Sequence, residues 1–292
     1  MRIVSLLPSA TEILHAVGAG GDVVGVTFEC DYPEAAREQA WIVSTSALPP
    51  GLDPHEIDAA VSAALARGDD LYHLDADALA DLDADLVVTQ DLCAVCAVDV
   101  SVVDDALAHL GCRADVLTVD PHTLDDVLES IVTIGERTGT RDRATALVAD
   151  LHRRLDAVRA AVAGRARPRM LILEWTDPPF APGHWLPEMV DLAGGECVLG
   201  TAAEKSMRVT WEDVRAGAPD VIVCAPCGFD LDGSARLAGA VLGELPPAPV
   251  WAVDANASYA RPGPRLVDGV EALAGILHPE VVASSPLARR IR

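Results

Sequence analysis

The sequence has 292 residues, more than the roughly 100–200 residues typical of one domain, so two domains are expected. Half of the residues are hydrophobic but only 4% are aromatic, which leaves aliphatic side chains to fill most of the interior. The formal net charge is −23 at pH 7, and the acidic residues are spread along the chain. This charge excludes a nucleic-acid backbone or an anionic membrane surface as a favoured partner.

The first twenty residues do not resemble a secretory leader, because polar residues such as Ser5, Ser9 and Glu12 interrupt the apolar run. No stretch approaches the roughly 18–20 apolar residues of a membrane span. The sequence therefore predicts a cytoplasmic protein. In that reducing compartment, its seven cysteines are expected to be free thiols or metal ligands rather than disulfides.

Short apolar runs alternate with helical patterns along the chain. The expected strands are residues 2–6, 22–27, 86–89, 114–119, 170–174, 221–225 and 250–253. Ser9 and Glu12 have the spacing of a capping box, which predicts a helix over residues 10–17. Alternation of short buried strands and helices is typical of open, mainly parallel sheets with helices on both faces.

These elements form two blocks, which predicts two Rossmann-like α/β lobes at residues 1–122 and 168–292. Residues 123–167 are expected to be a linker that includes one long helix. The apolar residues of this helix recur at helical spacing: Leu147, Leu151, Leu155 and Val158. From residue 141 to 163 it would be about 34 Å long, enough to join the lobes rigidly. Residues 48–68 are expected to be a surface insertion in the first lobe, with a helix beginning at Pro54.

Ligand sites in open α/β sheets lie beyond the carboxyl ends of the strands, and we expect them here in a cleft between the lobes. The loops at those ends contain most of the aromatic side chains of the chain: Phe28, Tyr32, Trp175, Phe180, Trp185, Phe229 and Tyr259. Flat aromatic faces at a cleft suit a planar or macrocyclic ligand. The alternative is that these loops pack on themselves.

Three polar residues of the same loops are further candidates. Glu174 ends an apolar strand, so its carboxylate is expected at the cleft, either accepting from a ligand or acting as a base. Its alternative role is a buried ion pair with Arg261. His184 lies between Gly183 and Trp185, where it either ligates a metal or contacts a ligand, or else is an ordinary hydrogen-bonding residue.

Four cysteines also fall in these loops: Cys30, Cys93, Cys96 and Cys227. Two C-x-x-C pairs occur, at Cys93/Cys96 and at Cys224/Cys227, and each is half of a four-thiolate site. Three alternatives remain open: small buried apolar residues, thiol chemistry, or an iron–sulfur cluster or zinc shared across the cleft. The metal alternative would make the protein an enzyme or a redox protein, with Glu174 or His184 as acid or base.

Several segments together resemble a known family. They are Arg2 to Glu12, Gly25–Val26, Asp31–Tyr32–Pro33, Asp85–Leu86–Val87, Pro178–Pro179–Phe180 and Gly194–Gly195. The pattern is similar to that of the cluster III substrate-binding proteins, and among them to the periplasmic binders of cobalamin, over nearly the whole chain. The resemblance implies two lobes joined by one long helix, with a ligand held between them without large closure. Relatives bind haem, siderophores, metal chelates or corrinoids.

The resemblance leads to the main hypothesis, a cytoplasmic protein that binds cobalamin or a related metal-centred tetrapyrrole or chelate. The expected contacts are Tyr32, Glu174, Trp175, Phe180, His184, Trp185, Phe229, Tyr259 and Arg261. Receptors of this family dock on a permease through acidic residues that correspond to Asp77 and Glu212 here. The cysteines and the 48–68 insertion depart from the family pattern. A ligand-sensing module that docks on another protein through those acidic residues is a third hypothesis.

Overall fold

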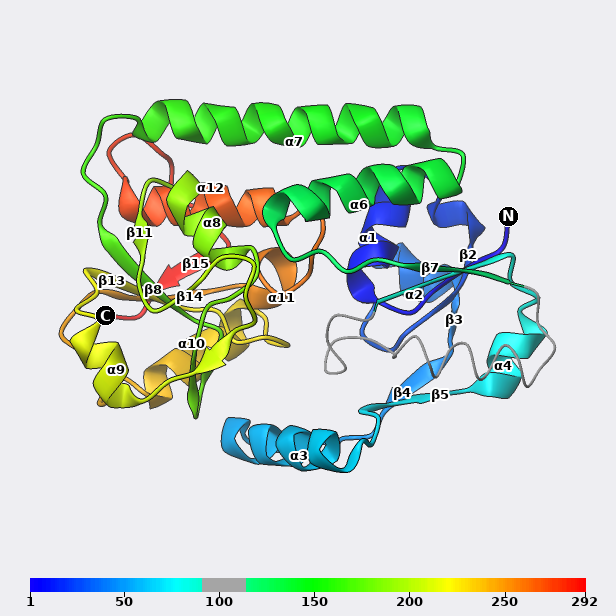
Figure 1. Ribbon diagram of the computed structural model, residues 1–292, viewed down its shortest axis with the longest axis horizontal. Coiled ribbons are helices and arrows are strands. Elements are labelled where there is room, and N and C mark those ends of the chain that lie inside the picture. Colours follow the sequence, from blue (N-terminus) through cyan, green and yellow to red (C-terminus); the bar gives the residue numbers. More distant parts are fainter. Residues whose placement is uncertain (91–113) are drawn as a thin grey trace. The chain divides into compact units, whose positions relative to one another are not determined.

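The structure is a computed structural model that describes residues 1–90 and 114–292. Its contacts divide the chain into two units, coloured by sequence in Figure 1. Unit 1 contains Met1–Pro121 and Leu128–Val148, and unit 2 contains His122–Val127 and Ala149–Arg292. Helices α6 (Leu124–Arg137) and α7 (Arg141–Val162) include residues of both units. The long helix predicted from residue 141 is therefore present as α7.

Unit 1 is built on a five-stranded sheet in which all neighbours are parallel, with the order β3-β2-β1-β6-β7. Its strands are β1 (Ile3–Ser5), β2 (Val23–Val26), β3 (Trp41–Ile42), β6 (Leu86–Thr89) and β7 (Asp115–Thr118). Every residue of β1 and β6 is buried, as expected for central strands covered on both faces. A separate two-stranded antiparallel sheet is formed by β4 (Ser44–Ser46) and β5 (Tyr72–Leu74).

The other elements of unit 1 are α1 (Pro8–Ala16), the 3₁₀ turn η1 (Gly20–Asp22), α2 (Ala35–Gln39), α3 (Pro54–Arg67) and α4 (Ala76–Asp81). The predicted insertion helix is α3, whose first turn is closed by a capping box between Asp53 and Glu56. The capping box predicted for the first helix is wrong. Helix α1 begins at Pro8, and Ser9 and Glu12 lie buried inside it. Pro8 explains the difference, because its fixed φ suits the first helical turn and it has no N–H that needs a cap.

Unit 2 is built on a second five-stranded sheet, in the order β11-β8-β13-β14-β15. Its strands are β8 (Arg169–Leu173), β11 (Glu196–Cys197), β13 (Val221–Cys224), β14 (Val250–Val253) and β15 (Ala288–Arg290). All neighbours are parallel except β14 and β15, so the prediction of open, mainly parallel α/β sheets is confirmed. A small antiparallel sheet follows β8 in the chain: β9 (Trp175–Thr176), β10 (Pro179–Ala181) and β12 (Met207–Arg208).

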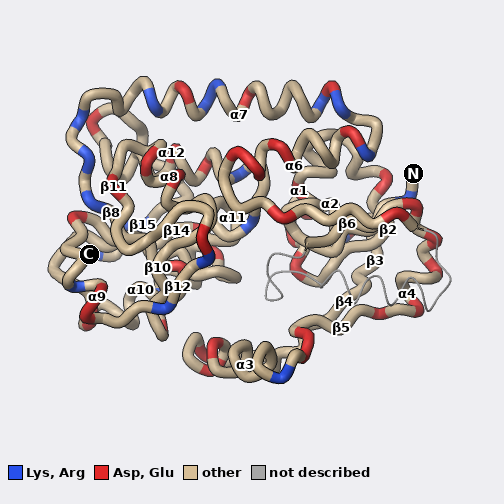
Figure 2. Tube along the Cα trace, in the orientation of Figure 1, with Lys and Arg blue, Asp and Glu red and all other residues tan. Residues whose placement is uncertain are grey.

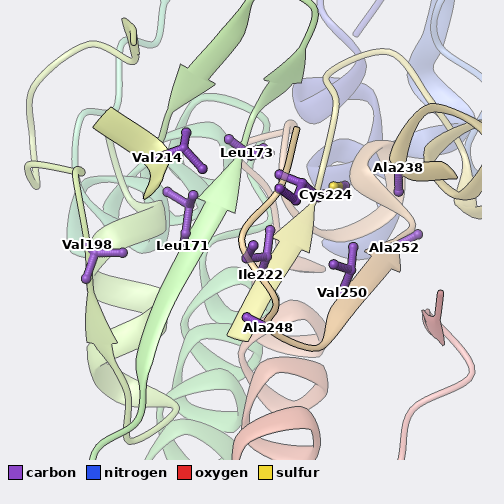
Figure 3. Packing of buried hydrophobic residues seen from close by; sticks show 11 residues of the cluster. Leu171, Leu173, Val198, Val214, Ile222, Cys224, Ala238, Ala248, Val250 and Ala252 are labelled. Carbon is purple, nitrogen blue, oxygen red and sulfur yellow. The ribbon is translucent and has the colours of Figure 1, made fainter. Parts of the chain in front are cut away.

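The helices of unit 2 are α8 (Leu186–Leu192), α9 (Trp211–Ala216), α10 (Leu231–Ala240), α11 (Ala255–Ser258) and α12 (Leu266–Leu277). One face of the main sheet supplies alternate residues of β8, β13 and β14 to a buried cluster, drawn as sticks in Figure 3. The cluster contains Leu171, Leu173, Val198, Val214, Ile222, Cys224, Ala238, Leu245, Ala248, Val250 and Ala252. It fixes the carboxyl ends of β8, β13 and β14 at one edge of the sheet.

Charged residues occur on elements throughout both units, with acidic residues the more frequent, as Figure 2 shows. Within the described ranges, no helix is both long enough and apolar enough to cross a membrane.

Candidate functional site

The candidate site lies in unit 2, at the carboxyl edge of its main sheet, where backbone hydrogen bonds join the loops that follow β8, β13 and β14. The amide of Cys227 donates to the carbonyl of Glu174 over 3.1 Å, and the amide of Asn256 donates to the carbonyl of Phe229 over 3.1 Å. The carboxylate of Glu174 accepts from the amide of Gly183 over 3.2 Å. Glu174 is therefore half-buried at a junction of three segments, and one of its carboxylate oxygens already has a backbone partner.

Three half-buried aromatic residues surround this junction, and we call Trp175, Phe180 and Phe229 the aromatic cluster. Trp175 and Phe180 are directly opposite each other on β9 and β10, so their side chains share one face. The rings of Trp175 and Phe229 have centroids 5.8 Å apart at 53°. The guanidinium of Arg208 lies 5.6 Å from the centroid of the Phe180 ring, on the next strand, β12. The cluster thus offers apolar ring surface next to a cation.

Two other predicted ligand contacts, Trp185 and Tyr259, are buried instead, with exposed fractions of 6% and 1%. The indole N–H of Trp185 donates to the carbonyl of Tyr259 over 2.8 Å, and the Tyr259 hydroxyl donates to the carbonyl of Gly269 over 3.1 Å. Burial raises the pKa of the Tyr259 hydroxyl well above its usual range. These two side chains therefore hold α8, α11 and α12 together and expose little ring surface to a ligand.

His184 is placed at the same junction in an unusual backbone conformation. Its φ is 49°, in the left-handed region that few non-glycine residues adopt. Its ring centroid lies 5.5 Å from that of Trp185 and 6.1 Å from that of His122. The Nε2 atom of His184 is buried and has no hydrogen-bond partner within the described ranges. Burial lowers the pKa of His184, and His122 and Lys205 lower it further.

His122 and Lys205 are site residues that the sequence analysis did not identify. His122 precedes α6 and belongs to unit 2, and Lys205 lies in the loop before β12. Lys205 is the only lysine among the 292 residues, and this rarity was the signal in the sequence that would have singled it out.

The remaining predicted positions are distributed over both units. Arg261 is half-buried in the segment after α11 of unit 2, whereas Tyr32 is 49% exposed in unit 1. Asp77 and Glu212 are both exposed, in the first turns of α4 in unit 1 and of α9 in unit 2.

The metal alternative for the cysteines is not supported. Cys93 and Cys96 lie outside the described residues, and within residues 1–90 and 114–292 no three His, Cys, Asp or Glu side chains gather as a metal site would require. Cys30 is fully buried, with its sulfur 3.1 Å from the hydroxyl oxygens of Thr11 and Thr27. Cys227 is exposed in unit 2. The predictions of an iron–sulfur cluster or zinc therefore lack support, because the described cysteines have no shared donor set.

Comparison with known proteins identifies the family of the chain. Residues 3–240 match the periplasmic binding protein family. The chain belongs to this family. The match covers most of both units, so it confirms the resemblance to the cluster III substrate-binding proteins inferred from the sequence.

Relatives and solved structures of the family match nearly the whole chain. The Vitamin B12-binding protein of Vibrio cholerae is 24% identical over 280 residues, which are 92% of this chain and 86% of the relative. The ABC transporter substrate-binding lipoprotein YvrC of Bacillus subtilis is 26% identical over 289 residues, 96% of this chain and 80% of the relative. The crystal structure of a periplasmic heme-binding protein from Pseudomonas aeruginosa has a TM-score of 0.72 and 19% identity, and the match covers 99% of this chain and 97% of that chain. This likeness confirms the fold.

The prediction of a cytoplasmic protein is wrong. The family is periplasmic, and the relatives include a lipoprotein of an ABC transporter, which points to an extracytoplasmic location. The prediction depended on the first residues of the sequence, and these do not report where the folded protein works. The argument that a reducing compartment keeps the cysteines free loses its basis for the same reason.

Proposed function

We propose that this chain is an extracytoplasmic binding protein for a metal-centred tetrapyrrole, cobalamin or haem, which it delivers to an ABC importer. The observation that carries the proposal is that a vitamin B12-binding protein and a heme-binding protein both match it over nearly its whole length. The two ligands differ in chemistry, but each is a broad macrocycle around a metal ion. The shared feature of the ligand is therefore a large ring face.

The aromatic cluster supports this proposal. Trp175, Phe180 and Phe229 are half-buried, so each ring has surface left for a ligand while its own packing holds it in place. Aromatic rings bind a flat apolar face at a low cost in side-chain entropy. Tyr32 offers a further exposed ring in unit 1, and we retain it as a proposed contact.

His184 adds a candidate polar contact for such a ligand. The lowered pKa favours its neutral imidazole, in which one ring nitrogen carries an N–H that can donate to a ligand. Its buried Nε2 has no described partner, so a bound group would satisfy it.

Delivery to an importer is proposed from the family and from the lipoprotein relative of an ABC transporter. Asp77 and Glu212 are exposed on separate units, in short helices, and we propose them as docking residues for the basic surface of a permease. Charge pairs of this kind change the rate of association more than the final affinity.

The test is a titration of the purified protein with cyanocobalamin and with haem, followed by visible absorption and calorimetry. We expect a saturable shift of the visible spectrum for one of the two macrocycles. The variant Trp175→Ala should weaken that binding, whereas Trp211→Phe, which keeps an aromatic ring at the start of α9, should not. If neither cobalamin nor haem binds at high micromolar concentration, the proposed function is wrong.

A further inference from the structure

Three cationic or ionisable nitrogen side chains gather at one corner of unit 2, in a chain whose net charge is −23. They are His122, His184 and Lys205, which we call the His–Lys corner. The rings of His122 and His184 are 6.1 Å apart, and Lys205 is close enough to lower the pKa of His184. The family match and the proposed function do not explain why the single lysine of the chain lies here.

The corner is held together by close backbone packing. The amide of His184 donates to the carbonyl of Glu204 over 2.6 Å, and the amide of Ala203 donates to the carbonyl of His184 over 3.0 Å. Gly183 permits this approach, because a Cβ at that position would lie 2.3 Å from the amide nitrogen of Ser206 and 2.6 Å from the carbonyl carbon of Lys205. The loop before α8 and the loop before β12 are therefore held together by their backbones, which fixes the segments that carry His184 and Lys205.

The two carboxylates next to the corner are held by backbone amides, and neither forms an ion pair with Lys205 in the described part of the chain. Asp126 accepts the backbone amides of His122 and Thr123, and Glu188 accepts the amide of Leu124. Lys205 forms no ion pair with any carboxylate in the described part of the chain. The ammonium of Lys205 and the Nε2 of His184 are therefore available to a ligand.

The occupant that fits these groups is an anion. A bare metal ion would be repelled by the ammonium of Lys205, which also disfavours protonation of His184. An oxyanion would be attracted by that ammonium and would accept an N–H from the unpartnered Nε2 of His184.

We propose that the His–Lys corner binds an oxyanion carried by the ligand, either a carboxylate or a phosphate. This inference rests on the proposed function and adds to it the group that unit 2 recognises, the acidic substituent of the tetrapyrrole. The carboxylate would come from the propionate chains of haem, and the phosphate from the nucleotide tail of cobalamin. The aromatic cluster would then select the ring face while the corner selects the charge.

The first experiment compares matched ligands that differ in the oxyanion. Iron protoporphyrin IX is compared with its dimethyl ester, and cobinamide phosphate with cobinamide, so that each pair differs in the oxyanion. We expect the acidic member of one pair to bind about tenfold more tightly, the value of one charge-assisted hydrogen bond. Lys205→Gln should remove most of that preference and leave the affinity for the neutral member unchanged.

Two further variants control for fold and for net charge. His184→Asn keeps a residue type that tolerates a positive φ and should also reduce the preference. Arg236→Gln removes a positive charge from an exposed site on α10 and should leave the preference intact. If the wild type binds both members of each pair equally, or if Lys205→Gln and Arg236→Gln behave alike, the corner proposal fails while the proposed function stands.

A second measurement decides the case in which no macrocycle binds. Because Lys205 is the only lysine, reductive methylation with ¹³C-formaldehyde labels one side chain and the terminal amine. A pH titration separates the two signals, because an α-amino group ordinarily has a lower pKa than a lysine side chain. Titration with inorganic phosphate and with acetate should shift the Lys205 signal saturably, and the shift should be weaker in His184→Asn. A saturable shift without macrocycle binding would support the corner and end the proposed function. A linear shift, identical in both proteins, would end the corner proposal.

Discussion

Two pairs of aromatic residues at the same edge of the unit 2 sheet have opposite environments. Trp185 and Tyr259 are buried and hydrogen-bonded to each other and to Gly269, whereas Trp175 and Phe229 are half-buried, with their ring centroids 5.8 Å apart in a tilted arrangement. Both pairs follow strands in the sequence, and both were expected to contact a ligand. The difference shows that a position beyond a strand end does not by itself leave an aromatic side chain exposed.

The hydrogen-bond partners of the ring N–H and O–H groups explain why one pair is buried and the other is half-buried. A buried indole N–H or phenol hydroxyl needs a partner, and the carbonyls of Tyr259 and Gly269 supply it. Trp175 donates its indole N–H to the nearby carbonyl of Asp177 over 3.0 Å, so its ring is oriented without being enclosed. The first pair thus stabilises the unit, and the second is left available for a ligand.

The largest effect is expected for Trp185→Ala. The change removes a buried ring and leaves the carbonyl of Tyr259 without its donor, so the free energy of unfolding should fall by about 3–5 kcal/mol. Urea denaturation followed by circular dichroism measures it. A variant of unchanged stability that has lost ligand binding would reverse the roles assigned to the two pairs.

A smaller loss is expected for Cys224→Ser, which extends the same comparison to the thiols. Cys224 is fully buried in the apolar cluster, and burial raises its pKa to about 12. A serine hydroxyl without a partner at that position should cost about 1–3 kcal/mol of unfolding free energy. Cys227→Ser, at an exposed position, should change it by less than about 0.5 kcal/mol. Equal losses in the two variants would contradict the assignment of Cys224 to the core.

For the half-buried pair, the expected loss is in binding. Phe229→Ala should weaken macrocycle binding about tenfold, equivalent to about 1.4 kcal/mol, because it removes one ring of the aromatic cluster. Calorimetry gives the affinity, and thermal denaturation gives the stability of the same sample. A loss of stability comparable to that of Trp185→Ala, with unchanged affinity, would place Phe229 with the buried pair.

The smallest effect concerns the pH dependence of stability. The pKa of His184 in the folded chain lies below its ordinary value, so the unfolded chain binds this proton more readily. The stabilisation from neutral His184 is therefore present above the ordinary histidine pKa of about 6.5 and is lost as the pH falls through the folded value. His184→Asn should lose less stability between neutral and mildly acidic pH than the wild type. His152→Gln, at an exposed position on α7, serves as the control and should follow the wild type.

Strands and long helices were predictable because their signals are local. All of the strands expected from apolar runs are present, and α7 begins at Arg141 as expected. The strands that were missed have two or three residues each, too few to form an apolar run, and β3, β11 and β15 among them lie at sheet edges. The first capping box was mispredicted because Pro8 begins the helix one residue before Ser9.

The site was less predictable because it depends on contacts between distant segments. His122 lies 62 positions before His184 in the sequence, and no periodicity relates them. Trp175 and Trp185 both have prolines close by in the sequence, yet only Trp185 donates to the carbonyl of Tyr259.

The sequence by itself determined the order of strands and helices, the long helix and the family of the chain, because hydrophobic runs, turn residues and shared motifs are local properties. Only the tertiary structure decided which aromatic residues are enclosed and which remain open, and which side chains join His184. Burial and charge proximity are properties of packed neighbours, and those neighbours come from loops that follow different strands. In unit 2, Gly183 and Gly269 allow two backbone segments to pack closely, because a Cβ at either position would lie 2.3 Å from a backbone atom of the other segment.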